Sequence, residues 1–267
     1  MRKYINLIIN DFVKNYEYLE NIQTKWGKPL VGFADAYENY IRRLKEIITP
    51  NHNLPEDVIP DAKVIIAYYI PFTKELALTN KTGNILASKQ WALAYEETNS
   101  MFIKLNEHLI KKLKEKGYNA SIAQDSLTFD QKTLKSNWSQ RHFAYAAGLG
   151  TFGLNNMLIT KQGCCGRFSS IVTNLNVETD HPIKEDYCLY KKYGTCGICV
   201  KNCPVKALKK EGYDRHLCYG VLQKNAEIYT DFGSSYVDET GINPNSVGSD
   251  VCGKCITQSP CAFWNLR

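Results

Sequence analysis

The segment CLYKKYGTCGICVKNCP, from Cys188 to Pro204, contains four of the ten cysteines in this chain of 267 residues. The last third of the chain contains four more, at Cys218, Cys252, Cys255 and Cys261. The chain is too long to need a disulfide scaffold, and its cysteines gather in one third of it. This distribution favours metal-bound thiolates in a reducing compartment over disulfides.

The spacing of these cysteines is typical of iron–sulfur proteins. Bacterial ferredoxins use the run C-x2-C-x2-C-x3-C-P, in which three cysteines bind one [4Fe–4S] cluster and the fourth crosses to the other. The pattern predicts that the first cluster is bound by Cys188, Cys196, Cys199 and Cys261. It predicts that the second is bound by Cys203, Cys218, Cys252 and Cys255. Two features depart from the ferredoxin run: seven residues separate Cys188 from Cys196, and Pro260 precedes Cys261 instead of following it.

Two structural zinc ions are the alternative, because C-x2-C units are also common in zinc sites. The Cys-x3-Cys-Pro step at Cys199–Pro204 favours iron and sulfide. Cys164 and Cys165 belong to neither set. Adjacent cysteines seldom bind one metal together, so we expect this pair to be free thiols in a loop.

Composition and charge narrow the class of protein. A hydrophobic content of 44% and a charged fraction of 22% are ordinary for a globular chain with a sizeable core. The N-terminus lacks the uninterrupted apolar run of a secretory signal, and no stretch is long enough to span a membrane, so a cytoplasmic protein is expected. The net charge is +6, but two bound clusters would lower it to about +2. Basicity is therefore weak support for a nucleic-acid partner.

Residues 1–175 show alternating helix and strand signals. The apolar run 64–70, closed by Pro71, predicts a buried central strand. Helices are expected at 2–19, 91–116 and 143–147, and further strands at 30–33, 120–123, 157–160 and 168–175. This pattern predicts a layered α/β or α+β domain over residues 1–175, followed by a small cysteine-rich domain of metal-bound loops over 176–267.

Two stretches resemble a known family. Trp138–Asn155, which reads WSQRHFAYAAGLGTFGLN, is similar to the R-A-G-L-G-W-I-G-K-N segment of epoxyqueuosine reductases. The stretch Gly212–Cys218 resembles the segment before the isolated cysteine of that family, and the order of the cysteines also matches. The resemblance implies an α+β fold, with a nitroreductase-like α/β domain that binds cobalamin and a bacterial-ferredoxin-like domain that carries two [4Fe–4S] clusters.

The resemblance also implies roles for the glycine-rich stretch. Three glycines within six residues permit close backbone approach to a large ligand, although a helix C-cap followed by a tight turn explains them equally. The expected cofactor-binding residues are Arg141, His142, Gly148, Leu149, Gly150 and Gly153. The alternative for Arg141 and His142 is a surface pair at a helix start. Trp91 and Tyr95 lie one helical turn apart. We expect them to be core residues, and a role in lining the cofactor site is the less favoured alternative.

The proton donor is expected among three residues. The family carries an aspartate before its glycine segment, and here Asp130 is the first candidate, with Asp125 behind it. Each is equally explained as a loop residue that forms a turn or caps a helix. Tyr145 is the other candidate, because the related reductive dehalogenases use a tyrosine.

The predicted function is a cobalamin-dependent iron–sulfur oxidoreductase that takes electrons from an external donor of the flavodoxin or ferredoxin type. Epoxyqueuosine reductases carry a C-terminal helical-repeat extension that helps to hold tRNA, whereas this chain ends at Arg267. A small molecule, or a corrinoid partner protein that needs reductive activation, is therefore expected before tRNA. The alternative function is a ferredoxin-like electron carrier that docks a partner enzyme and binds no corrinoid.

Overall fold

The computed structural model describes residues 1–123, 128–233 and 248–263. Its longer helices are α1 (Arg2–Tyr16), α6 (Lys89–Lys114), α7 (Gln140–Ala146) and α10 (Arg215–Ile228). The shorter ones are α2 (Asn39–Arg42), α3 (Leu44–Ile47), α4 (Pro55–Val58), α5 (Lys74–Thr79), α8 (Leu189–Tyr193), α9 (Ile198–Asn202) and α11 (Lys254–Thr257). The strands are β1 (Leu30–Asp35), β2 (Val64–Pro71), β3 (Ala120–Ser121), β4 (Phe129–Asp130), β5 (Lys135–Ser136), β6 (Gly150–Phe152), β7 (Leu158–Thr160) and β8 (Gly166–Thr173).

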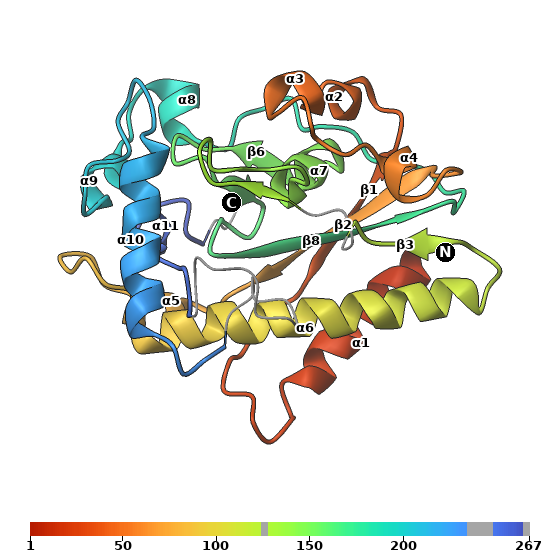
Figure 1. The fold of residues 1–267 in the computed structure, drawn as a ribbon, viewed down its shortest axis with the longest axis horizontal. Helices are drawn as coiled ribbons and strands as arrows, with labels where there is room; N and C mark the ends of the chain where they lie inside the picture. Colours follow the sequence, from red (N-terminus) through yellow and green to blue (C-terminus); the bar gives the residue numbers. More distant parts are fainter. Residues whose placement is uncertain (124–127, 234–247, 264–267) are drawn as a thin grey trace.

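A four-stranded sheet in the order β1-β2-β8-β3 forms the centre of the molecule (Figure 1), and its neighbouring strands are all antiparallel. The predicted central strand is β2, and all eight of its residues are buried. Successive side chains of a strand point to opposite faces, so a strand of this kind must be covered on both sides. Ile66 and Tyr68 pack with α1 and α6 on one face, and Ile65 and Tyr69 pack with α7 on the other.

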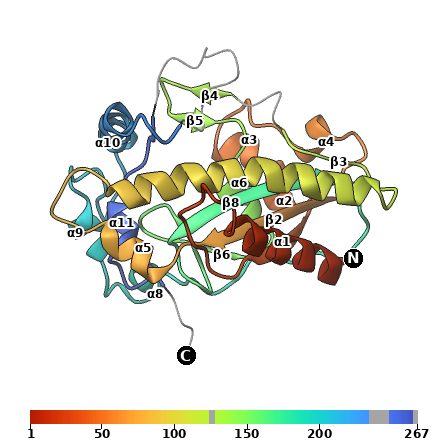
Figure 2. The same ribbon diagram turned by 90° about the horizontal axis from the view of Figure 1, so that it is seen from below.

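The long helix α6 runs along the sheet, with α1 packed beside it (Figure 2). The Ser88 side chain caps its N-terminus by accepting a hydrogen bond from the Trp91 backbone. Beyond its C-terminus, Gly117 adopts a φ of +84°, the left-handed conformation expected of a capping glycine. In the part of the chain that the structure describes, no helix is both long enough and apolar enough to cross a membrane.

Most expected elements are present with shifted ends. The helices expected at 2–19, 91–116 and 143–147 are α1, α6 and α7, and the strand expected at 120–123 is the two-residue β3. Several elements were not expected, among them β6 and α10. Strand β6 lies within the glycine-rich stretch and pairs with β7, and α10 lies in the region predicted to be loops. Asp214 caps α10 through the Leu217 backbone, and the helix buries Val221, Asn225 and Ala226.

The cysteine-rich last third packs against one end of the sheet layer, where α8, α9, α10 and α11 gather (Figure 1). Hydrogen bonds tie it to the preceding residues. The Asp180 carboxylate accepts from the Arg2 guanidinium at 2.7 Å and from the Phe33 backbone at 2.9 Å. The Asn80 side chain donates to the Cys252 carbonyl at 2.7 Å. The mixed α and β content is confirmed, and the domain boundary at residue 176 stays a prediction.

Candidate functional site

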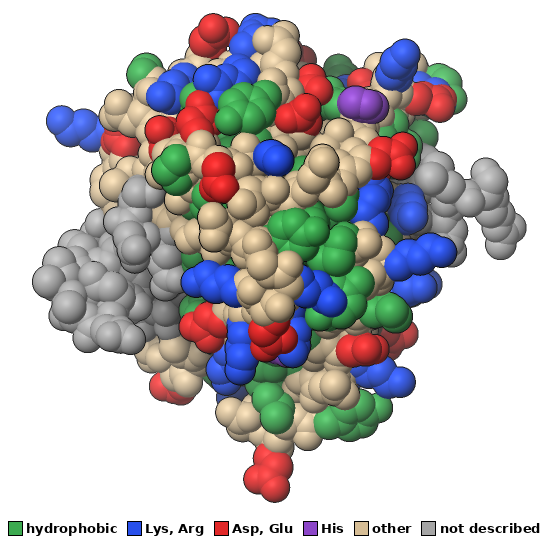
Figure 3. Space-filling model, turned by 90° about the vertical axis from the view of Figure 1, so that its right-hand side faces the viewer, with side chains coloured by type: hydrophobic (Ala, Val, Ile, Leu, Met, Phe, Trp, Pro, Cys, Tyr) green, Lys and Arg blue, Asp and Glu red, His purple; other side chains and the backbone are tan. Residues whose placement is uncertain are grey.

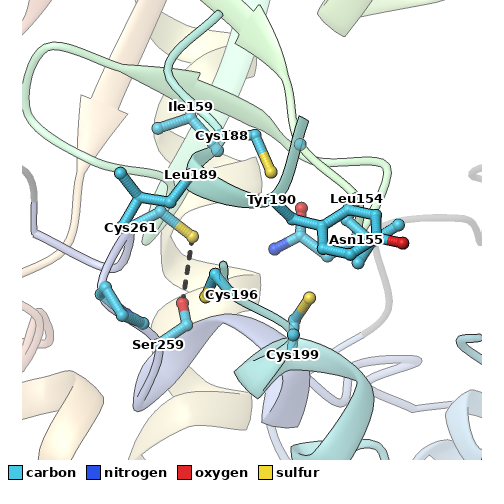
Figure 4. A pocket seen from close by; sticks show the side chains of 13 residues that line it. Leu154, Asn155, Ile159, Cys188, Leu189, Tyr190, Cys196, Cys199, Ser259 and Cys261 are labelled. Carbon is cyan, nitrogen blue, oxygen red and sulfur yellow. Dashed lines mark hydrogen bonds between the residues drawn. The ribbon is translucent and has the colours of Figure 1, made fainter. Parts of the chain in front are cut away.

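Four of the predicted ligands line one small cavity. Figure 4 shows the thiols of Cys188, Cys196, Cys199 and Cys261 directed toward it. Cys188 is the N-cap residue of α8, and Cys199 lies in α9. Burial, together with the three neighbouring thiols, raises the pKa of Cys199 to about 11. The cavity thus gathers the same four cysteines that the sequence assigns to the first cluster.

The other four cysteines form a second set, beside the first. Burial raises the pKa of Cys252 to about 11, and the nearby Cys218 and Cys203 thiols contribute to the rise. Burial and the thiols of Cys252, Cys218, Cys199 and Cys203 raise the pKa of Cys255 well above its ordinary value. Cys218 likewise interacts with Cys203. All four members therefore influence one another, and Cys199 with Cys255 connects the two sets.

This donor chemistry fits a cationic cluster core. Burial, with the repulsion between neighbouring thiolates, raises the pKa values of Cys199, Cys252 and Cys255, and a bound metal removes that penalty by deprotonating each thiol. Four cysteine thiolates are the ligand set of a [4Fe–4S] core, and each set of cysteines supplies four.

A buried hydrogen-bond donor lies against the second set. The indole Nε1 of Trp91 is buried and has no hydrogen-bond partner among the described residues. It packs on the loop between Cys252 and Cys255, where a Cβ on Gly253 would come within 2.5 Å of it. A buried N–H without an acceptor is costly, and a cluster sulfur beside this loop would accept it. Trp91 packs in the core, as expected, but it also borders the site.

The Cys164–Cys165 pair contacts the first set. Both thiols are buried in the turn before β8. The Cys164 backbone donates to the Cys261 carbonyl at 2.9 Å, and the two Sγ atoms lie 3.8 Å apart. Ser259 Oγ lies 3.2 Å from the Cys261 sulfur. The pair lie in a turn, and Cys164 with Ser259 contacts Cys261, which the sequence did not indicate; that the two serve as free thiols stays a prediction.

The glycine-rich stretch is packed tightly against its own chain. Gly148 follows α7 with a φ of +66°, and a Cβ there would come within 2.6 Å of the His181 carbonyl. On Gly150, a Cβ would lie 2.1 Å from the Ile159 carbonyl, and on Gly153 it would lie 2.7 Å from the Asn155 side chain. These close approaches serve the cap of α7 and the β6–β7 pair. Contact of these glycines, or of the buried Leu149, with a cofactor stays a prediction.

Four half-buried rings form a platform on α7 and its neighbours: Tyr40, His142, Tyr145 and Phe152. The Tyr40 and Tyr145 ring centroids are 4.7 Å apart, and those of His142 and Phe152 are also 4.7 Å apart. Burial, with a contribution from the Arg141 charge, lowers the pKa of His142 to about 3, so its ring is neutral. Its Nδ1 lies 2.6 Å from Ser139 Oγ. This aromatic platform groups four rings, tilted to one another, without a charged ring among them.

The aromatic platform lies near the second set of cysteines. Arg141, next to His142 in the chain, donates to the Asn156 carbonyl at 2.6 Å. Burial raises the pKa of Cys218, and the positive charges of Arg141 and Arg215 oppose that rise. Both arginines also lower the pKa of His142, so their charges act on the platform as well as on the second set of cysteines. Neither Arg215 nor the Tyr40 and Phe152 rings were identified from the sequence, because only the fold brings them to α7.

Asp130 lies at the end of β4 in a two-stranded hairpin and is exposed. Its carboxylate accepts hydrogen bonds from the Lys132 and Thr133 backbones at 2.8 and 3.1 Å. These bonds lower its pKa, whereas a proton donor at neutral pH needs a raised one. The geometry is that of a turn-forming aspartate, and its catalytic role stays a prediction. Asp125 lies outside the described residues.

Two proteins that are similar in sequence to this chain are both epoxyqueuosine reductases. No family model matches the chain. It is 41% identical over 70 residues to an epoxyqueuosine reductase of Lactococcus garvieae (strain Lg2), which is 26% of this chain and 18% of the relative. It is 31% identical over 113 residues to that of Leadbetterella byssophila, which is 41% of this chain and 35% of the relative.

Solved structures give the same answer for the fold. A selenomethionine-labelled epoxyqueuosine reductase superposes with a TM-score of 0.53 at 19% identity, over 96% of this chain and 66% of its own. The enzyme from Bacillus subtilis gives 0.52 at 18%, over 98% and 66%. A third, solved with an epoxyqueuosine-modified tRNA-Tyr stem loop, gives 0.51 at 19%, over 96% and 66%. This chain therefore matches less than two thirds of the length of these relatives.

Proposed function

From the premise that this chain is an epoxyqueuosine reductase-like protein, we propose that it is an iron–sulfur oxidoreductase with two [4Fe–4S] clusters and a corrinoid cofactor. One observation carries the proposal: eight cysteines gather at one end of the sheet as two adjoining sets of four. The assignment pairs Cys261 with the first set and Cys203 with the second, so each cysteine-rich segment contributes to both.

The residues in and around the two sets of cysteines would have different roles. The thiols would hold the iron, and the buried Trp91 N–H and Ser259 hydroxyl would donate to sulfur. Hydrogen bonds to the sulfurs and burial are what tune the potential of such a cluster. Cys199 lies close enough to Cys255 to contribute to its raised pKa, which supports two clusters that would lie next to each other. When bound, the clusters supply single-electron transfer, and a corrinoid supplies low-valent cobalt as the reducing centre.

The corrinoid would be held at the aromatic platform. The neutral ring of His142 and the rings of Tyr145, Tyr40 and Phe152 suit the flat face of a macrocycle. Arg141 provides positive charge beside it. The predicted glycine contacts, at Gly148, Gly150 and Gly153, belong to the same stretch. The Tyr145 hydroxyl is the proton donor that we favour, since it lies on the platform whereas Asp130 lies in an exposed turn.

We take the substrate to be a small molecule, or a corrinoid protein in need of reductive activation. The solved relative that contains an epoxyqueuosine-modified tRNA-Tyr stem loop makes that stem loop the competing substrate to assay. Turnover of the stem loop would replace our choice of substrate without changing the cofactor assignment.

Anaerobic purification with cobalamin supplied tests the proposal. We expect about eight irons and eight sulfides per chain, together with the absorption bands of a bound corrinoid. A Tyr145→Phe variant should keep both cofactors and lose turnover. Full iron and sulfide without cobalt would support the other candidate, a ferredoxin-like carrier that docks a partner enzyme. A colourless protein that contains zinc would exclude both.

A further inference from the structure

The segment around the first cavity carries charge of one sign. Residues 187–210 contain six lysines and no aspartate or glutamate. All six are exposed, and together they form what we call the lysine face: Lys191, Lys192, Lys201, Lys206, Lys209 and Lys210. The opposite end of the molecule differs, since acidic and basic side chains are intermixed there (Figure 3). Residues 187–210 therefore form a segment of one charge sign, bounded in the sequence by Glu185 and Asp186 on one side and Glu211 on the other.

The lysine face is also the outer wall of the first cavity. Leu189, Tyr190, Cys196 and Gly197, which line the cavity, all belong to the same segment. The Lys210 side chain lies over the Tyr190 ring at 5.6 Å, and a Cβ on Gly197 would be 3.7 Å from Lys210 Cε. Only this short segment separates the predicted first cluster from solvent on this side.

Two apolar side chains are exposed among the lysines. Tyr193, at the end of α8, is 61% exposed, and Ile198, at the start of α9, is 37% exposed. An apolar centre with a charged rim is the usual composition of a protein–protein contact. It differs from a uniformly solvated lysine patch, which gains nothing from exposed tyrosine and isoleucine.

The charge of the lysine face is mostly uncompensated within the chain. Lys192 forms an ion pair with Glu185. For the other five lysines, the described residues include no acidic side chain within ion-pair distance. Their charges point to solvent, where an approaching acidic surface would meet them, and such charges steer association at long range.

We propose that the lysine face is the docking site of an acidic electron-carrier protein that reduces the first cluster. The inference rests on the proposed function. In the step, one electron leaves the reduced flavin or iron–sulfur centre of the carrier, and the core bound by Cys188, Cys196, Cys199 and Cys261 goes from the 2+ to the 1+ state. No covalent bond forms or breaks.

A protein fits this face better than a nucleic acid does. Residues 187–210 contain no arginine, although arginine is the residue whose planar fork matches phosphate groups. The exposed Tyr193 and Ile198 suit an apolar contact. Small contacts dominated by charge are typical of transient redox complexes.

The test compares two variants of equal charge. In the face variant, Lys191, Lys201, Lys209 and Lys210 are each replaced by Gln. In the control variant, the exposed Lys3, Lys14, Lys111 and Lys114 of α1 and α6 are replaced by Gln. The clusters of each holo-protein are reduced in a stopped-flow instrument by a reduced flavodoxin, and separately by the methyl viologen radical cation, at several salt concentrations.

We expect reduction by flavodoxin to slow about tenfold or more in the face variant at low salt, and its salt dependence to flatten. The control variant should stay within about twofold of the wild type, and viologen should reduce all three proteins at similar rates. Equal slowing in both variants would overturn the docking site alone. So would an epoxyqueuosine-bearing tRNA stem loop that binds the wild type but not the face variant, with flavodoxin reduction unaffected. A wild type without clusters would overturn the proposed function and the docking site together.

Discussion

The sheet layer and the cysteine-rich third hold their structures by different means. In β2 every residue is buried, and its side chains pack between helices on both faces. In residues 187–210 few side chains are fully buried, and those few include Cys188 and Cys199. Apolar burial stabilises the first region. The second gathers thiols such as Cys199 and Cys255, whose pKa values are raised by burial and by the neighbouring thiols, so we infer that it depends on metal for its stability.

Removal of the metal should separate the two regions most strongly. When an iron chelator strips the holo-protein under anaerobic conditions, we expect the amides of α8, α9 and α11 to lose their protection from hydrogen exchange. Those of β2 and β8 should keep theirs, because ladder bonds and apolar packing on both faces hold them. Hydrogen-exchange mass spectrometry reads both regions in one sample. Equal loss of protection in the sheet would show that the two regions form one cooperative unit.

A core truncation should have the reverse effect. Ile66 is fully buried, lies opposite Phe33 and Ile171 in the sheet, and packs under α6. Ile66→Ala removes buried methyl groups and leaves a cavity, which costs about 2–5 kcal/mol. We expect a lower denaturation midpoint with unchanged iron per folded chain. The exposed Ile103→Ala on α6 is the control and should stay within about 0.5 kcal/mol. Lost iron in the folded Ile66→Ala protein would argue that the sheet also shapes the cluster site.

The same contrast explains what the sequence could predict. The apolar run of β2 and the helical periodicity of α6 directly indicate buried side chains. The ends of both elements were therefore predicted to within two residues. The cysteine spacing grouped four thiols that line one cavity in the structure, and their role as ligands stays a prediction. The Cys164–Cys261 contact spans 97 positions, and no local pattern reports it. The aromatic platform was not predicted for the same reason, since only the fold brings Tyr40 to the α7 rings. Helix α10 was missed because its short apolar face is interrupted by Asn225.

Gly253 tests the cysteine-rich third without removing a ligand. Its φ is +72°, and an added Cβ would lie 2.5 Å from the Trp91 indole. Gly253→Ala should therefore strain the loop between Cys252 and Cys255 by about 1–3 kcal/mol. We expect the second cluster to be lost on mild oxidation while the first survives, as seen by iron counts and electron paramagnetic resonance. Gly212→Ala is the matched control, because a Cβ there meets nothing within 4 Å. Similar cluster retention in both variants would contradict the strained role of Gly253.

The aromatic platform gives the smallest and most local prediction, since it adjoins both regions. Burial lowers the pKa of His142 to about 3, against about 6.5 in the unfolded chain. Between these values the unfolded state binds the extra proton, so the contribution of His142 to stability is complete above about pH 6.5 and declines as the pH falls toward 3. The slope is at most about 1.4 kcal/mol per pH unit.

Denaturant unfolding of the wild type and of His142→Asn, at several pH values from 7.5 to 5, measures this slope. Asparagine keeps a polar partner for Ser139 Oγ but does not titrate, and the other buried histidine, His52, is present in both proteins. The difference in unfolding free energy between the two proteins should therefore shrink as the pH falls below 6.5. Parallel pH profiles would show that folding does not shift the pKa of His142, so that its ring is not desolvated as the structure indicates. A difference that grows as the pH falls would show a raised pKa and a charged ring, which would contradict the neutral aromatic surface on which the corrinoid assignment depends.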